Sequence, residues 1–125
     1  MILDFNAMPA NDVPHFKGGE GHVVIRKYDD PRMGAAVRLT VPAGCSIGLH
    51  THTGNCELIY VLSGSGLCTD DGAEYPLTAG MCHYCPEGHS HGIRNTGSQP
   101  LELLAALPSV VLGFLGMVVI APFLQ

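Results

Sequence analysis

Short apolar runs, each ended by glycine, proline or an aspartate-rich turn, are the feature that most limits the fold of this chain. They lie at residues 22–28, 35–41, 46–52, 57–62, 66–69, 73–77, 81–85, 90–95 and 101–107. Before Pro108 no stretch shows the long, capped pattern of period 3.6 that a helix needs. Eight or nine short strands at this spacing predict an all-β antiparallel sandwich or barrel with few or no helices.

The chain has 125 residues, which is the size of one domain. No internal repeat, low-complexity tract or linker divides it. We therefore expect an irregular N-terminal segment at residues 1–21, one β domain at residues 22–107 and an apolar C-terminal tail at residues 108–125. Within the β domain, the Asp71-Gly72 pair predicts a tight hairpin, because both residue types tolerate positive φ.

Composition narrows the class of protein and its surroundings. Hydrophobic residues make up 46% and charged residues 14% of the chain, which excludes disorder. The net charge of −5 disfavours binding to the phosphate backbone of nucleic acids. The count of 5 Cys is odd, and the N-terminus lacks the basic and apolar regions of a signal peptide. We expect free thiols and a cytoplasmic location.

The tail is unusual because no charged residue follows Glu102. The segment after Pro108 is shorter than the roughly twenty residues that a membrane-spanning helix needs. We expect it to form a strand or helix that packs against a second copy, which predicts a homodimer. A membrane anchor and a terminus unlike that of the natural gene product are the alternatives.

Three histidines and one glutamate suggest a metal site. His50 and His52 flank one residue of a predicted strand, so both side chains leave the same face, roughly 6.5–7 Å apart. Glu57 opens the next strand after a glycine- and asparagine-containing turn, and His91 stands in a later short strand. Three imidazoles and one carboxylate suit Zn, Fe, Mn, Ni or Cu, and the set does not choose among them.

The spacing of these residues resembles that of the cupin superfamily, in particular the small single-domain cupins. The pattern Gly-x5-His-x-His-x4-Glu-x6-Gly is formed by Gly44, His50, His52, Glu57 and Gly64. A second pattern, Gly-x5-Pro-x-Gly-x2-His-x3-Asn, is formed by Gly80, Pro86, Gly88, His91 and Asn95. The resemblance covers residues 22–107 and implies a jelly-roll β-barrel. It also implies that His50, His52, Glu57 and His91 bind one divalent ion (Zn, Fe, Mn or Ni).

Other residues leave alternatives open. His89 forms a second His-x-His pair with His91 and could replace it as a ligand, although the motif spacing favours His91. His83 lies in a predicted strand whose facing is not determined, so it either lines the site or points outward. Tyr60 and Tyr84 could contact a polar substrate, but tyrosines more often belong to the core or rim.

The pair Cys82 and Cys85 forms a Cys-x-x-Cys motif. Redox or zinc use would place both thiols on a turn or a helix start. In a strand, residues three apart point to opposite faces, so we expect buried, inert thiols instead. Asn95 is expected to hold a turn through its amide rather than to contact a ligand.

The resemblance implies a metal-dependent enzyme, similar to dioxygenases, decarboxylases or isomerases, acting on a small polar or anionic organic molecule. The alternative is a non-catalytic module that binds a small ligand and a metal. In both cases the expected partner is a small molecule, without nucleic acid and without a membrane.

Overall fold

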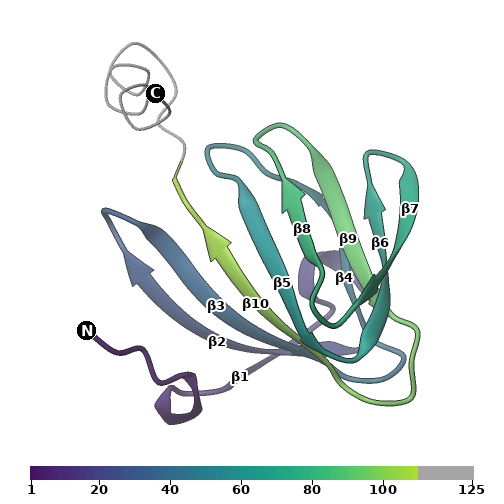
Figure 1. Cartoon of the computed structure of the whole chain (residues 1–125), viewed down its shortest axis with the longest axis horizontal. Helices are drawn as coiled ribbons and strands as arrows, with labels where there is room; N and C mark the ends of the chain where they lie inside the picture. The colour runs from purple at the N-terminus through teal and green to yellow at the C-terminus, as the bar shows by residue number, and fades with distance from the viewer. Residues whose placement is uncertain (110–125) are drawn as a thin grey trace.

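The computed structural model describes residues 1–109, which form ten strands in two sheets (Figure 1). One sheet has six strands in the order β1-β2-β3-β10-β5-β8, and the other has four in the order β4-β9-β6-β7. The strands are β1 (Asn11–Pro14), β2 (His22–Asp30), β3 (Gly34–Val41), β4 (Ser46–Thr51), β5 (Glu57–Ser63), β6 (Ser65–Asp70), β7 (Ala73–Thr78), β8 (Cys82–Cys85), β9 (Ser90–Asn95) and β10 (Leu101–Leu107). Neighbouring strands pair antiparallel, which confirms the predicted all-β class.

The core lies between the two sheets, where alternate residues of each strand point inward. Strand β3 shows the pattern most clearly, because Ala35, Val37, Leu39 and Val41 are buried while the residues between them are half-buried. They meet the fully or nearly fully buried side chains of Ile59, Val61, Ile93, Leu101 and Leu103 from β5, β9 and β10. Burying each such side chain contributes about 1.5–3 kcal/mol, so the apolar alternation stabilises the two-sheet arrangement.

Two local features predicted from sequence hold the strands in register. Asp71 and Gly72 both have positive φ, 45° and 87°, and join β6 to β7 in a tight hairpin. Asn95 is buried, and its amide donates to the carbonyls of Val41 and Gln99, each at 2.8 Å. Asn95 thus ties the turn after β9 to the end of β3, as expected.

The N-terminal segment is more ordered than predicted. Within residues 1–21, which we expected to be irregular, it contains 3-10 turns η1 (Phe5–Ala7) and η2 (Phe16–Gly18) and strand β1. Strand β1 pairs with β2 from Asn11 opposite Ile25 to Pro14 opposite His22. Backbone pairing needs no apolar alternation, which explains why the sequence pattern did not reveal this edge strand.

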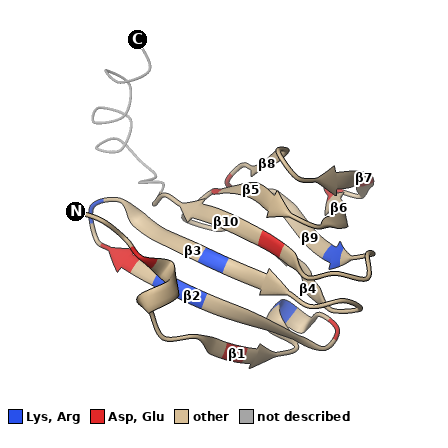
Figure 2. Cartoon of the chain, turned by 60° about the horizontal axis from the view of Figure 1, so that its bottom comes forward, with Lys and Arg blue, Asp and Glu red and all other residues tan. Residues whose placement is uncertain are grey.

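The outer face of the six-stranded sheet carries both charged and apolar side chains, and Figure 2 marks a basic position on β3 beside an acidic position on β10. A central polar group links β3 and β10, where the Glu102 carboxylate accepts hydrogen bonds from Arg38 and Thr40, each at 2.8 Å. Elsewhere this face exposes apolar side chains, including Leu58 and Leu104.

Strand β10 leads into the start of the apolar tail. The carbonyl of Pro108 accepts a hydrogen bond from the backbone N–H of Cys56, and Ser109 forms an isolated bridge with Asn55. The rest of the predicted tail element lies outside the described residues. Among residues 1–109, no helix has the length and apolar character to cross a membrane.

Candidate metal centre

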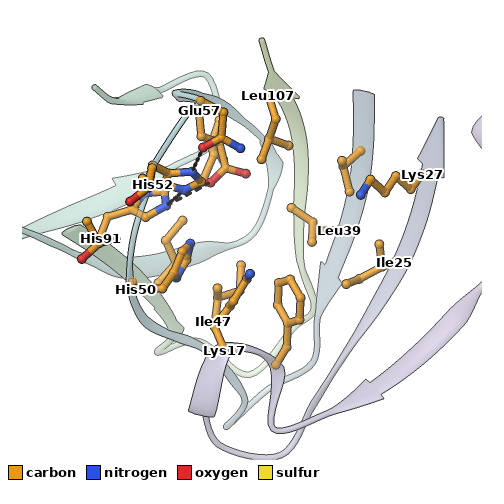
Figure 3. Close-up of a pocket in the computed structure, with 18 residues that line it drawn as sticks. Lys17, Ile25, Lys27, Leu39, Ile47, His50, His52, Glu57, His91 and Leu107 are labelled. Carbon is orange, nitrogen blue, oxygen red and sulfur yellow. Dashed lines mark hydrogen bonds and ion pairs between the residues drawn. The ribbon is translucent and has the colours of Figure 1, made fainter. Parts of the chain in front are cut away.

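The four predicted ligand residues come from three neighbouring segments of backbone. His50 lies in β4 opposite His91 of β9, and the two strands are directly paired. His52 follows the end of β4, where its backbone N–H donates to the carbonyl of His89 at 3.1 Å. Glu57 is the first residue of β5. The barrel therefore brings His50, His52, Glu57 and His91 together, as the motif spacing predicted (Figure 3).

The potential ligand atoms of these four residues all lie within 4.8 Å of one another. Nε2 of His52 is 2.9 Å from Nε2 of His91, and Oε1 of Glu57 is 3.1 Å and 2.9 Å from these two nitrogens. His52, Glu57 and His91 are buried, with 6%, 7% and 1% exposure, whereas His50 is half-buried. The cluster thus has one open side, at His50.

Hydrogen bonds to the other ring nitrogens orient all three imidazoles. Nδ1 of His50 lies 2.7 Å from the carbonyl oxygen of Gly48, and Nδ1 of His52 lies 2.9 Å from Oδ1 of Asn55. Because these oxygens accept, each Nδ1 carries the proton and each Nε2 is left with a lone pair. Nδ1 of His91 is 3.2 Å from Nε2 of His83, which can accept in the same way. Such outer partners are typical of metal-binding histidines.

These distances fit a bound cation. Two ligand atoms about 2.1 Å from one ion and at right angles to each other are about 3.0 Å apart. The separations among His52, His91 and Glu57 match that value. In addition, several lone pairs face one another in a buried space, and a shared cation removes their repulsion. The chemistry and spacing of the set are therefore compatible with a divalent metal ion.

Burial also favours the neutral forms of the nearby imidazoles. It lowers the pKa of His50 below the ordinary value of 6.5, and the neighbouring His91 and His52 act in the same direction. Burial likewise lowers the pKa of His83. A neutral imidazole is the form that binds a metal, so the lowered pKa of His50 favours metal binding.

The cluster lies at one end of a cavity of about 380 Å³ between the two sheets. Beyond the four residues, the walls are mostly apolar, with Ile25, Leu39, Ile47 and Leu107 among them (Figure 3). A small organic molecule entering this cavity would meet the open side of the cluster.

The remaining sequence candidates lie outside the four-residue cluster. His89 precedes β9, is half-buried and lies 3.0 Å from the carboxylate of Asp71, which places it outside the cluster that contains His91. Tyr60 and Tyr84 are exposed on the outside of the six-stranded sheet and do not line the cavity. His83 points inward and contacts the ring of His91.

The Cys-x-x-Cys pair is split across its strand. Cys85 is buried but Cys82 is exposed, so the expectation that both thiols are buried is wrong for Cys82. The cause is the alternation of β8, whose successive residues face opposite sides. His83, Cys85 and His91 form a second group of possible ligands, but burial raises the pKa of the Cys85 thiol to about 11, which disfavours the thiolate that binds metals.

Sequence reasoning missed three residues around the site. Asn55 was read as part of a turn, yet it orients His52. Lys17 and Lys27 line the cavity and were not considered. Lys27 could have been found, because it follows Ile25 by two residues in β2 and so shares its face. Lys17 had no such signal.

Comparison with known proteins finds similar sequences and similar structures. An oxalate-binding protein of Thermotoga maritima is 31% identical over 112 residues, which are 86% of this chain and 93% of that protein. The crystal structure of a predicted oxalate decarboxylase from Thermotoga maritima aligns with a TM-score of 0.83 at 31% identity, covering 87% of this chain and 99% of the other. An RmlC-like cupin from Shewanella frigidimarina shares the fold, with a TM-score of 0.72 at 18% identity over 86% of this chain and 89% of its own.

The family assignment rests on a family-model match together with the relative that is 31% identical. The family model of the cupin domain matches residues 37–107, which include all four clustered residues and strands β4 to β10. The chain therefore belongs to the cupin family and has its jelly-roll β-barrel fold.

Proposed function

We propose that His50, His52, Glu57 and His91 hold one divalent transition metal ion and that the protein binds a small organic anion through it. The observation that carries this proposal is the convergence of four oriented ligand atoms at the end of a cavity. The donor set suits Zn, Fe, Mn and Ni alike, so the identity of the ion is left open.

Charge supports an anionic ligand. Glu57 is the one carboxylate among the cavity-lining residues of the described chain, and the three histidines are neutral when they bind a metal. A divalent ion would therefore leave about one positive charge at the site. Carboxylate or enolate oxygens are the ligands that such a centre attracts, in line with the name of the oxalate-binding relative.

We further propose that the protein is a metal-dependent enzyme with dioxygenase-, decarboxylase- or isomerase-like chemistry. A bound ion supplies Lewis acidity, or oxygen activation if it is iron. The backbone carbonyl of Gly48 and the side-chain oxygen of Asn55 accept hydrogen bonds from His50 and His52 and thereby keep both imidazoles oriented.

A non-catalytic binding module is the second candidate. Apart from Glu57, the lining of the described cavity has no aspartate, glutamate or tyrosine that would exchange a proton with a substrate. One similar protein is named for binding rather than for turnover. In this case the same centre would store or sense the anion without changing it.

Metal analysis comes first as a test. Protein dialysed separately against Mn²⁺, Zn²⁺, Fe²⁺ and Ni²⁺ should retain about one equivalent of at least one ion, and His52→Ala should lose it while its circular dichroism spectrum stays unchanged. Oxalate should then bind to the loaded protein, measured by calorimetry, and not to the metal-free protein. Equal oxalate binding by both forms would contradict the proposal.

Turnover separates the two candidates. Loaded protein is incubated with oxalate and other small carboxylates, and the mixture is followed by NMR and an oxygen electrode. A metal-dependent product supports the enzyme. An anion that raises the melting temperature and is recovered unchanged, with all four ions tested, supports the binding module.

We also propose a cytoplasmic homodimer. All five cysteines are free, as expected in a reducing compartment, and the outer sheet face exposes Leu58, Tyr60, Tyr84 and Leu104, which a second copy could cover. Light scattering of the full chain should give twice the mass of 13.2 kDa. A monomeric mass at micromolar concentration would contradict the dimer.

A further inference from the structure

Both lysines of the chain, Lys17 and Lys27, line the same cavity as the four-residue cluster. The chain as a whole is acidic, with a net charge of −5. Both lysines nevertheless border one mostly apolar space, together with the proposed metal site. A cavity bordered by positive charges favours the entry of anions.

Lys27 reaches the cavity from the wall opposite the histidines. It stands in β2 on the same face as Ile25, and its amino group points from β2 into the cavity (Figure 3). Its charge partner is Asp29, with Nζ 3.4 Å from the carboxylate, and the two side chains are 50% and 72% exposed. An ion pair this exposed is weak, so the ammonium group remains free to bind an incoming anion.

Lys17 is held at the cavity by a strained turn. Its φ is 56°, in the left-handed region that residues other than glycine rarely adopt. The turn sits flush against β4, because a Cβ on Gly48 would lie 2.1 Å from the carbonyl oxygen of Lys17. The same Gly48 orients His50 through its carbonyl. The backbone that places Lys17 is therefore tied to the backbone that orients a proposed ligand.

The space between the histidines and Lys27 is too large and too apolar for oxalate alone. A cavity of about 380 Å³ falls within the size range of sites for larger organic ligands. A two-carbon dianion bound at the metal would leave most of its walls uncovered. The apolar lining of the cavity includes Ile25, Val37, Leu39, Ile47, Ile59 and Ile93.

We infer that the cavity binds a dicarboxylate longer than oxalate. One carboxylate binds at the proposed metal, the hydrocarbon spacer lies along the apolar walls, and the second carboxylate binds the ammonium group of Lys27. Lys17 adds positive potential from the β4 side. This inference rests on the proposed function, because the first carboxylate needs the metal.

Calorimetry on the metal-loaded full chain tests the inference with oxalate, succinate, glutarate and adipate, and with butyrate, pentanoate and hexanoate as the singly charged partners of the last three. At least one of the longer dicarboxylates should bind about fivefold more tightly than the monocarboxylate of equal length, which is the upper end for an ion pair at a half-exposed lysine. Lys27→Met should remove this difference and Lys27→Arg should keep it. Oxalate affinity should change less than about twofold in Lys27→Met.

Arg32→Met is the matched control, since it also removes one positive charge but lies 88% exposed and outside the cavity lining. It should leave all affinities unchanged. Tight binding of oxalate with no advantage for longer dicarboxylates would overturn this inference and leave the proposed function intact. Equal weakening of oxalate and glutarate by Lys27→Met would overturn it as well. If no carboxylate binds the loaded protein, the proposed function fails and the inference with it.

Discussion

The chain contains two His-x-His pairs, and the barrel uses them differently. In the first pair, His50 and His52 both point into the cluster. In the second, His91 is 1% exposed within the cluster, whereas His89 lies outside beside Asp71. The spacing in the sequence is identical, so spacing alone does not decide which histidines meet.

The backbone around each pair explains the difference. Side chains two residues apart share a face while the chain is extended, as between His50 and the position just after β4. His89 precedes the start of β9, and its N–H is turned back to the carbonyl of Pro86. The rule of alternating faces therefore does not apply to it. A proposed ligand is identified by its place in the strand and not by the motif alone.

The largest expected effect is the difference in metal affinity between variants of the two histidines of the second pair. His91→Ala should lower metal affinity more than about 100-fold, because it removes one of the four proposed ligand atoms. This loss is larger than the one expected when only an outer partner of a ligand is removed. His89→Ala should leave the affinity within about twofold. Competition with a chelating dye measures both values.

Because His91 is buried, its removal also leaves a cavity that can destabilise the fold. The metal affinity of His50→Ala is therefore measured as well, since His50 is only half-buried. Their metal affinities are compared only if both variants unfold cooperatively on heating. A metal affinity that depends on His89 as strongly as on His91 would reverse the comparison.

The two thiols of β8 likewise belong to one sequence motif but differ in burial. Burial raises the pKa of Cys85 to about 11, which lowers the fraction of reactive thiolate at neutral pH. Iodoacetamide should therefore label exposed Cys82 well before Cys85 in the folded protein. Mass spectrometry of digested, partly labelled protein measures the order, and equal rates would show that β8 does not alternate as described.

A smaller effect is expected at Asn55, which orients one histidine of the first pair. Asn55→Ala removes the acceptor of the Nδ1–H of His52 and should lower metal affinity about tenfold. Asn55→Asp keeps an acceptor oxygen and should restore most of the affinity. An equal loss in both variants would mean that Asn55 matters for the turn and not for the imidazole.

The smallest effect is on the stability of the metal-free protein at different pH values. Burial lowers the pKa values of His50 and His83 in the folded state, so on acidification the unfolded chain takes up protons first. Stability is fully present above about pH 6.5 and falls as the pH drops below it. Each half-buried histidine contributes less than about 1.4 kcal/mol per pH unit.

Urea unfolding between pH 5 and 8 measures this slope. The double variant His50→Gln, His83→Gln should show a smaller slope than the parent protein. A free energy of unfolding that is constant over this range in the parent would contradict the assigned direction of the two pKa shifts.

Much of the fold was predictable because strands and turns have local signals. The alternation of β3 and the Asp71-Gly72 hairpin each depend on the types of consecutive residues, and the structure has both. Strand β1 was missed because its residues carry no apolar alternation and it forms through backbone pairing to β2. The predicted homodimer and the role of the apolar tail stay predictions, since residues 110–125 are outside the described structure.

The candidate site was predictable in its four main residues and less so in its surroundings. Ordered motif positions identified the histidines and Glu57, and the structure brings them within 4.8 Å of one another. The partners that orient them depend on geometry across strands, such as His83 of β8 beside His91 of β9. The position of Lys17 depends on a left-handed turn that its residue type does not favour.

The most direct test of the central proposal is anomalous diffraction from crystals of the full chain loaded with one transition metal, recorded on both sides of its absorption edge. We predict one strong peak about 2.0–2.2 Å from Nε2 of the three histidines and from a carboxylate oxygen of Glu57. A fully loaded crystal with its peak at any other group of side chains would contradict the account.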